Sequence, residues 1–291
     1  MAYLIPFDPW KNPRCTCPPK FSLNPYTGCS HGCLYCYASS FIKDFFKPRE
    51  KKNFLKILKK EVENLPKESL ISLSNSSDPY QKLEEKFLFT RKALEIFKEK
   101  NFKVLIITKS DLVLRDLDLL SKMRVAVTMT ITTLKHFKKL EPGAPPPQKR
   151  IEALKILKKA KIPVGLRLDP IIPFLNEDEI EEIIKKVAPF ILHLTTSTFK
   201  PKIDSWKRIK KAFPEVAKKL ERFYFKEGEK IGGSFYLPLN LRKEIILKVR
   251  KVCQKYQIPF ASCREGFLDL NTAPSCDGSW LIQCSRSKIG E

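Results

Sequence analysis

Three cysteines lie close together in the segment NPYTGCSHGCLYCYA, residues 24–38. Cys29, Cys33 and Cys36 are separated by three residues and then by two. A structural zinc site needs four ligands, and a closed iron–sulfur cubane also needs four. Three thiolates on one tight loop can hold three irons of a [4Fe–4S] cluster and leave the fourth iron open to a non-protein ligand. The alternative is a zinc site completed by His31 or by a distant cysteine.

The elements around these cysteines follow an alternating pattern. Short apolar segments that predict buried strands occur at 69–76, 103–110, 124–132, 162–172 and 190–198, and a further strand is expected to end at FSLNPYT, just before the cysteines. Between them, apolar residues recur at helical spacing in 54–62, 88–97, 111–122, 151–157 and 180–187, and again in 239–253. We expect an α/β fold, a partial (β/α)6 TIM-like barrel with parallel strands, with a doubly wound open sheet as the alternative.

The composition limits the class of protein. The chain has 291 residues and is 43% hydrophobic, which is enough for a full core. It has no apolar run long enough to span a membrane and no secretory signal, so we expect a cytoplasmic protein without a membrane partner. The net charge of +23 favours a DNA or RNA partner. The alternative is the charged surface of a heat-adapted, thermophile protein.

The spacing Cys29-x-x-x-Cys33-x-x-Cys36, with the aromatic Tyr35 before the last cysteine, resembles the signature of radical S-adenosylmethionine (SAM) enzymes. The segments SNSSDPYQKLEEKFLFTRKALEIF, ITKS, LEPGAPPPQKRIEALKILKKAKIPVGLRLDPIIPFLNEDEI and SCDGS resemble the spore photoproduct lyase-related branch, over about residues 15–284. The resemblance implies a [4Fe–4S] cluster on the three cysteines and SAM on the open iron. It also implies reductive cleavage to methionine and a 5′-deoxyadenosyl radical, with electrons from a low-potential donor such as ferredoxin or flavodoxin.

The resemblance also implies a SAM site, to which Tyr35 belongs. It puts Ser77 and Asp78 near the SAM amino and ribose groups, and Lys109 at the SAM carboxylate. All three follow expected strands, where ligands of such folds bind. Ser77 and Asp78 could instead cap a turn before Pro79, and Lys109 could be a solvated surface lysine.

Two further residues complete the SAM pocket that the resemblance implies. Thr130 follows the fourth expected strand, and Arg167 lies in the sequence RLDP. A guanidinium and a hydroxyl suit a ligand with one carboxylate. The alternative for Arg167 is an internal salt bridge with Asp169 or Glu141.

One position departs from the family pattern. True spore photoproduct lyases have a cysteine just after the second strand, which returns a hydrogen atom to the product, and Asn75 stands there in this chain. An amide cannot donate a hydrogen atom as a thiol does, so we do not expect that reaction by that route. A C-terminal cysteine could be the donor instead.

The reaction we expect is hydrogen abstraction from a nucleic-acid component, in repair or modification, by a lyase- or transferase-like radical SAM enzyme. A base inside a duplex would have to be flipped out. Two alternatives stay open. One is a radical SAM enzyme acting on a peptide, protein or small molecule, and the other is a zinc-stabilised nucleic-acid-binding protein without catalysis.

The remaining cysteines suggest a second metal site. Nine cysteines in such a chain indicate metal or redox chemistry rather than structural disulfides. We expect Cys15 and Cys17 to join two of the C-terminal cysteines, Cys263 and Cys276, with Cys284 as another candidate, in a zinc or Fe–S site. Free buried thiols or one disulfide are the alternative. Cys253 falls on the apolar face of the last helix and is expected in the core.

We expect three regions in the chain: an N-terminal extension (1–20), a core barrel (21–200), and a basic, aromatic, helical region with a cysteine-containing extension packed on the core (201–291). The segment 200–230 is basic and contains Trp206, Phe213, Phe223, Tyr224 and Phe225. It is either a nucleic-acid-binding face or an amphipathic helical segment whose aromatic side chains are core.

Overall fold

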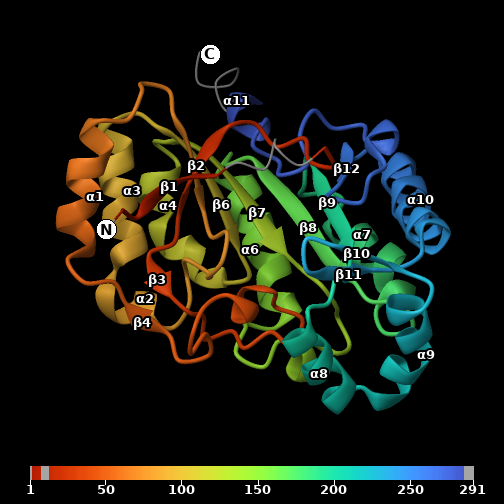
Figure 1. The fold of residues 1–291 in the computed structure, drawn as a ribbon. Helices are drawn as coiled ribbons and strands as arrows, with labels where there is room; N and C mark the ends of the chain where they lie inside the picture. The colour runs from red at the N-terminus through yellow and green to blue at the C-terminus, as the bar shows by residue number, and fades with distance from the viewer. Residues whose placement is uncertain (1, 8–12, 285–291) are drawn as a thin grey trace.

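One mixed sheet forms the centre of the protein in the computed structural model, which describes residues 2–7 and 13–284 (Figure 1). The eight strands have the order β1-β2-β5-β6-β7-β8-β9-β12. Only β1 is antiparallel to its neighbour; all other pairs are parallel. The strands are β1 (Leu4–Phe7), β2 (Lys20–Leu23), β5 (Leu70–Leu73), β6 (Lys103–Thr108), β7 (Arg124–Thr130), β8 (Val164–Ile171), β9 (Leu194–Thr198) and β12 (Phe260–Ser262).

The strand order decides between the two expected architectures. From β2 to β12 the order follows the chain without a reversal. A doubly wound sheet has a point at which the strand order reverses, and right-handed crossovers in one direction instead put the helices on one face. The partial TIM-like barrel is therefore confirmed. It has seven parallel strands rather than six, because the short β12 from the C-terminal region adds to the edge at β9.

Helices cover the outer face of this sheet (Figure 1). The five long ones that were predicted are present, although their ends differ by a few residues: α1 (Phe54–Glu63), α3 (Phe89–Glu99), α6 (Pro147–Lys159), α7 (Ile180–Val187) and α10 (Leu239–Lys255). The single helix expected over 111–122 is a 3-10 helix η3 (Asp111–Asp116) followed by α4 (Leu117–Leu120). Ser110 caps it, since its hydroxyl accepts a hydrogen bond from the Leu112 amide at 3.2 Å.

Shorter elements occupy the connections. They are β3 (Tyr26–Thr27), β4 (Arg49–Glu50), β10 (Glu229–Ile231), β11 (Ser234–Tyr236), α2 (Leu83–Phe87), α5 (Phe137–Leu140), α8 (Ile203–Ala212), α9 (Pro214–Phe225), α11 (Leu281–Cys284), η2 (Ala38–Ser40), η4 (Glu177–Glu179) and η5 (Leu268–Leu270). No helix in the described ranges is long and apolar enough to cross a membrane.

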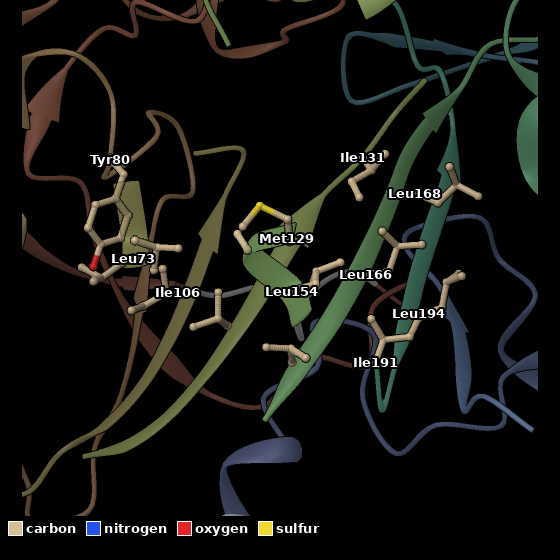
Figure 2. Packing of buried hydrophobic residues seen from close by; sticks show 14 of the residues in the cluster. Leu73, Tyr80, Ile106, Met129, Ile131, Leu154, Leu166, Leu168, Ile191 and Leu194 are labelled. Atoms are coloured by element: carbon tan, nitrogen blue, oxygen red, sulfur yellow. The ribbon is translucent and has the colours of Figure 1, made fainter. Parts of the chain in front are cut away.

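The core lies between the sheet and its helices. Alternate strand residues such as Ile106, Met129 and Leu166 point toward the helices and pack with Leu154 of α6 (Figure 2). Because side chains alternate along a strand, the intervening residues face the inside of the barrel. Apolar residues of α11 pack on the inside of β6 and β7, in a cluster of Leu105, Ala126, Leu281 and Ile282. The C-terminal segment thus fills part of the barrel and leaves the carboxyl ends of the strands free for a site.

The basic segment 200–230 forms α8 and α9. Trp206 and Tyr224 are buried, and their rings meet edge to face at 5.5 Å. Tyr224 also donates a hydrogen bond to the Phe199 carbonyl at 2.8 Å. These contacts favour the amphipathic-helix alternative over a base-stacking face. Cys253 of α10 is buried in the core, as expected.

Candidate active site

The three-cysteine loop lies between β3 and η2. Cys29 and Cys33 are buried and Cys36 is half-buried. Burial raises the pKa of the Cys29 thiol to about 12. The sulfurs of Cys29, Cys33 and Cys36 do not all lie within 4.8 Å of one another. Among the described residues, the sulfurs of Cys15, Cys17 and Cys276 do. The loop cysteines are therefore too far apart to share one ion, whereas ligands of a cluster bind different irons.

The loop after α5 clamps the cysteine loop through the backbone. The Leu34 amide donates to the Leu140 carbonyl at 3.0 Å, and the Gly143 amide donates to the His31 carbonyl at 2.9 Å. A Cβ atom at Gly143 would lie 2.0 Å from the carbonyl oxygen of Ser30. This close backbone approach requires glycine. The proline-rich segment 141–148 therefore supports the cysteine loop.

A buried ion pair fixes this support. Glu141 and Arg150 are both fully buried, and their charged groups lie 2.6 Å apart. Arg150 also donates to the Thr130 carbonyl at 3.1 Å, and the Tyr35 hydroxyl donates to Glu141. Burial alone would raise the pKa of Glu141, but Arg150 and Lys109 lower it to about 2. Sequence reasoning missed this network; its signal was an arginine placed one turn before Ala153 and Leu154 on the apolar face of α6.

Lys109 directly follows β6 and faces the cysteine loop. Its Nζ lies 5.5 Å from the centre of the Tyr35 ring. Burial alone would lower its pKa, but Cys33 and Glu141 raise it, so the side chain stays a cation. Across the described residues, no carboxylate oxygen lies within 4.0 Å of this Nζ. Among the described residues Lys109 thus makes no close ion pair, although Glu141 acts on it at longer range, and the solvated-surface alternative does not describe this half-buried cation.

Ser77 and Asp78 form the turn after β5. Asp78 accepts hydrogen bonds from the Thr108 hydroxyl at 2.7 Å and from the Tyr80 amide at 2.9 Å. The Ser77 hydroxyl donates to the Tyr26 carbonyl at 3.0 Å. These contacts are those of the turn-capping alternative. Contact of either side chain with SAM stays a prediction.

Thr130 is the last residue of β7 and is paired in register with Arg167, which lies in the middle of β8 rather than at its end. Thr130 is buried, and Arg167 forms an ion pair with Asp169 at 3.0 Å. Asp169 also accepts from the Ser197 hydroxyl at 2.6 Å. Of the two partners considered for Arg167, Asp169 is the one it pairs with, because Glu141 pairs with Arg150 instead. The structure brings Thr130 and Arg167 to the same end of the sheet as Lys109.

Asn75 lies inside the barrel near the cysteine loop. Its Nδ2 donates to the Ser22 hydroxyl at 2.6 Å, and its backbone carbonyl accepts from the Tyr37 hydroxyl. The side chain that stands where the family pattern has a thiol is therefore held by the first strand of the parallel set.

Exposed aromatic rings follow the cysteine loop. The exposed fractions of Tyr37, Phe41 and Phe46 are 52%, 68% and 43%. The Lys202 ammonium lies 4.5 Å from the Phe41 ring centre, and the Arg208 guanidinium lies 5.1 Å from that of Phe46. Sequence reasoning sought such a surface in 200–230 and missed this one, because three isolated aromatics in an irregular loop have no periodicity.

The cysteines of the expected second site lie together. The sulfur of Cys276 is 3.9 Å from that of Cys15 and 3.4 Å from that of Cys17. Cys263 packs against the same cluster, but its sulfur is not among the three that all lie within 4.8 Å of one another. Cys284 ends α11, and its side chain lies outside the described residues.

Comparisons with known proteins identify relatives of this arrangement. The family model described as the radical SAM superfamily matches residues 23–187. An uncharacterized protein of Methanocaldococcus jannaschii is 36% identical over 197 residues, which cover 64% of this chain and 71% of that protein.

Solved structures share the fold. Spore photoproduct lyase complexed with dinucleoside spore photoproduct superimposes with a TM-score of 0.67 at 18% identity, covering 83% of this chain and 75% of that one. SuiB of Streptococcus suis bound to the precursor peptide SuiA superimposes with a TM-score of 0.54 at 14% identity, covering 83% and 48%. At these identities the likeness concerns the fold alone.

Proposed function

Since this chain belongs to the radical SAM superfamily and is therefore an enzyme, we propose that it binds a [4Fe–4S] cluster through Cys29, Cys33 and Cys36. We propose further that it uses SAM to abstract hydrogen from a nucleic-acid component. When bound, the reduced cluster supplies one electron that cleaves SAM to methionine and a 5′-deoxyadenosyl radical. The observation that carries the proposal is Lys109, a half-buried cation that faces the cysteine loop and makes no ion pair within 4.0 Å among the described residues.

The cysteine loop fits a cluster. Its thiols are buried or half-buried and spread more widely than one ion would need. The clamp at Gly143 and the hydrogen bond from Tyr35 hold the loop through contacts within the protein. A prearranged loop lowers the entropy that ligand binding costs.

The strand ends fit SAM. Lys109 would bind the SAM carboxylate, because a charge-assisted hydrogen bond is the strongest contact a carboxylate can make. Thr130 and Arg167 lie on neighbouring strands at the same edge, and Arg167 keeps donors beyond the one that it gives to Asp169. Ser77 and Asp78 would fix the turn that borders the ligand, and the Tyr35 ring would form the floor under Lys109.

The cofactor proposal is tested by anaerobic reconstitution. We expect a brown protein with about four irons at this site that forms 5′-deoxyadenosine from SAM under a strong reductant. Replacement of Cys33 by Ser should abolish both properties. A colourless wild-type protein without SAM cleavage would contradict the proposal and support a nucleic-acid-binding protein without catalysis.

The nucleic-acid part of the proposal is supported by two features. The net charge of +23 attracts a phosphate backbone, and the exposed rings of Tyr37, Phe41 and Phe46 follow the cysteine loop directly. Stacking on exposed aromatics beside cations is how proteins hold unpaired bases. A base in a duplex would have to leave the stack to reach the barrel. Electrons would come from a low-potential donor such as ferredoxin or flavodoxin.

Binding of labelled single-stranded DNA and RNA, measured by fluorescence anisotropy across a salt series, tests the substrate class. We expect affinity that falls steeply with salt and is highest for an unpaired strand. No binding at low ionic strength would refute this part and favour a peptide or small-molecule substrate, while the cofactor proposal would stand.

A further inference from the structure

We propose that Cys15, Cys17, Cys263 and Cys276 bind one zinc ion, which fastens the segment between β1 and β2 to the last strand of the sheet. The proposal does not depend on the substrate or on the cluster. The distances between the sulfurs indicate which metal would bind, and the two segments that carry the cysteines indicate what the ion would join.

The sulfur spacing selects a single tetrahedral ion. Zinc–sulfur bonds of about 2.3 Å in a tetrahedron put the sulfurs about 3.8 Å apart. The sulfur of Cys276 lies 3.4 Å from that of Cys17 and 3.9 Å from that of Cys15, and Cys263 packs against the same cluster. A disulfide would need about 2.05 Å. The sulfurs of Cys15, Cys17 and Cys276 all lie within 4.8 Å of one another, which those of the three loop cysteines do not, and Cys263 would move toward them to complete the four ligands.

The surroundings suit a closed structural site. Ala261, Ala273 and the half-buried Trp280 pack around the sulfurs. Four thiolates around one zinc ion leave a net negative charge, and two cations lie near enough to interact with it. They are Lys20, which is buried and paired with Asp277 at 2.6 Å, and Arg167. Four protein ligands leave no open position, so the ion is structural rather than catalytic.

The topology shows what the ion would join. Cys15 and Cys17 precede β2, beside the first edge of the sheet, and Cys263 directly follows β12, the strand at the other edge. The red segment before β2 runs across to β12 in Figure 1. Its arrival there is also seen at Arg14, whose guanidinium lies 6.0 Å from the Tyr236 ring centre and whose side chain contacts Gly266.

A short edge strand needs such a fastening. β12 has three residues and pairs with β9 on one side only. Backbone hydrogen bonds of an edge strand are open to water and to other chains. A zinc ion that ties β12 to the crossing segment would cover this edge and close the open side of the partial barrel.

Metal analysis of protein purified anaerobically, without added metal, tests the site. We expect about one zinc per chain. X-ray absorption at the zinc edge should show four sulfur neighbours at about 2.3 Å. Cys276→Ser should lose the zinc and unfold at a lower temperature. The matched control Cys253→Ser removes a buried thiol in α10 and should keep the zinc.

Three outcomes would overturn the proposal: wild-type protein with about eight irons and no zinc, disulfides between these cysteines without metal, or zinc with fewer than four sulfur neighbours. Cys33→Ser should lose iron and keep zinc, so failure of the cofactor proposal is distinguished from failure of this one. If Cys276→Ser does not fold, the wild-type spectrum still decides.

Discussion

Replacing Arg150 by Met tests whether the buried ion pair supports the cysteine loop. The change removes the cation and keeps a side chain of similar length. Glu141 then stays fully buried with its carboxylate facing no guanidinium. Breaking one side of a buried pair costs about 3–5 kcal/mol, because the remaining charge is uncompensated.

The pKa of Glu141 gives a second, independent magnitude. In the folded protein it is lowered from its ordinary 4.5 to about 2, where burial acts against the shift and Arg150 and Lys109 produce it. Such a shift corresponds to about 3 kcal/mol of folding stability. The sign is that of a lowered carboxyl pKa: the contribution is complete above pH 4.5 and is lost as the pH falls toward 2.

The assay is thermal unfolding of the reconstituted enzyme with iron analysis of each variant. We expect Arg150→Met to lower the midpoint by about 6–20 °C and to retain less iron, because the clamp on the cysteine loop loosens. Glu141→Gln together with Arg150→Met should recover part of the loss, since no buried charge remains. The control is Lys155→Met on the same helix. It breaks an exposed ion pair, in which Lys155 and Glu152 lie 3.6 Å apart with side chains 60% and 57% exposed. This change should alter the free energy of unfolding by less than about 0.5 kcal/mol.

Two results would refute this reasoning. One is a variant Arg150→Met as stable as Lys155→Met. The other is a double variant no more stable than Arg150→Met alone, which would show that packing and not charge is lost. Glu141→Gln should also flatten the loss of stability between pH 4.5 and 2; an unchanged profile would assign that loss to other carboxylates.

Three further changes probe the site. Gly143→Ala should cost iron occupancy and activity, since its Cβ would meet the Ser30 carbonyl at 2.0 Å; an iron content equal to wild type would show that the loops can separate freely. Lys109→Met should weaken SAM binding, measured by calorimetry, about 10- to 150-fold, because a hydrogen bond to a charged group contributes about 1.5–3 kcal/mol. The control Lys103→Met, at the other end of β6, should leave SAM affinity unchanged. Equal affinities of the two variants would show that Lys109 does not bind SAM. Phe41→Ser should weaken single-strand binding by about 1–3 kcal/mol and leave SAM cleavage without substrate unchanged. The control is Leu247→Ser, which removes an exposed apolar side chain from α10. Equal losses of single-strand affinity in the two variants would argue against stacking on Phe41.

Much of the fold could be predicted from the sequence because its parallel strands are continuous apolar runs. β6, with its sequence KVLIIT, and β7 stand out from their polar surroundings, and both lie near the expected bounds. β12 could not be found, because three residues carry no period and pair only through the distant β9. The tight turns of η3 were read as an α-helix, since both forms put similar residues on one face.

The site was predictable where chemistry is carried by residue type and spacing. The cysteine motif and the position of Lys109 directly after β6 follow from local sequence, whereas Arg167 lies in the middle of β8. The pairing of Arg150 with Glu141 did not, because a buried ion pair depends on which turns of the chain meet in space. The exposure of aromatic side chains could not be predicted from the sequence either. Trp206 and Phe41 both lie in basic segments, yet Trp206 is buried in the core and Phe41, after the cysteine loop, is exposed to solvent.

The four cysteines of the proposed zinc site also have a consequence for folding during protein synthesis. Cys15 and Cys276 are 261 positions apart. At about 5–20 residues per second, the first cysteines wait about 13–52 s on the ribosome before their partners are synthesised. During that time the segment before β2 has no edge to close against, and its thiols are open to other metals and to oxidation. If the proposed zinc site forms, it can join the two edges of the sheet only after Cys276 has been synthesised, and zinc supply at that stage would affect the yield of folded protein.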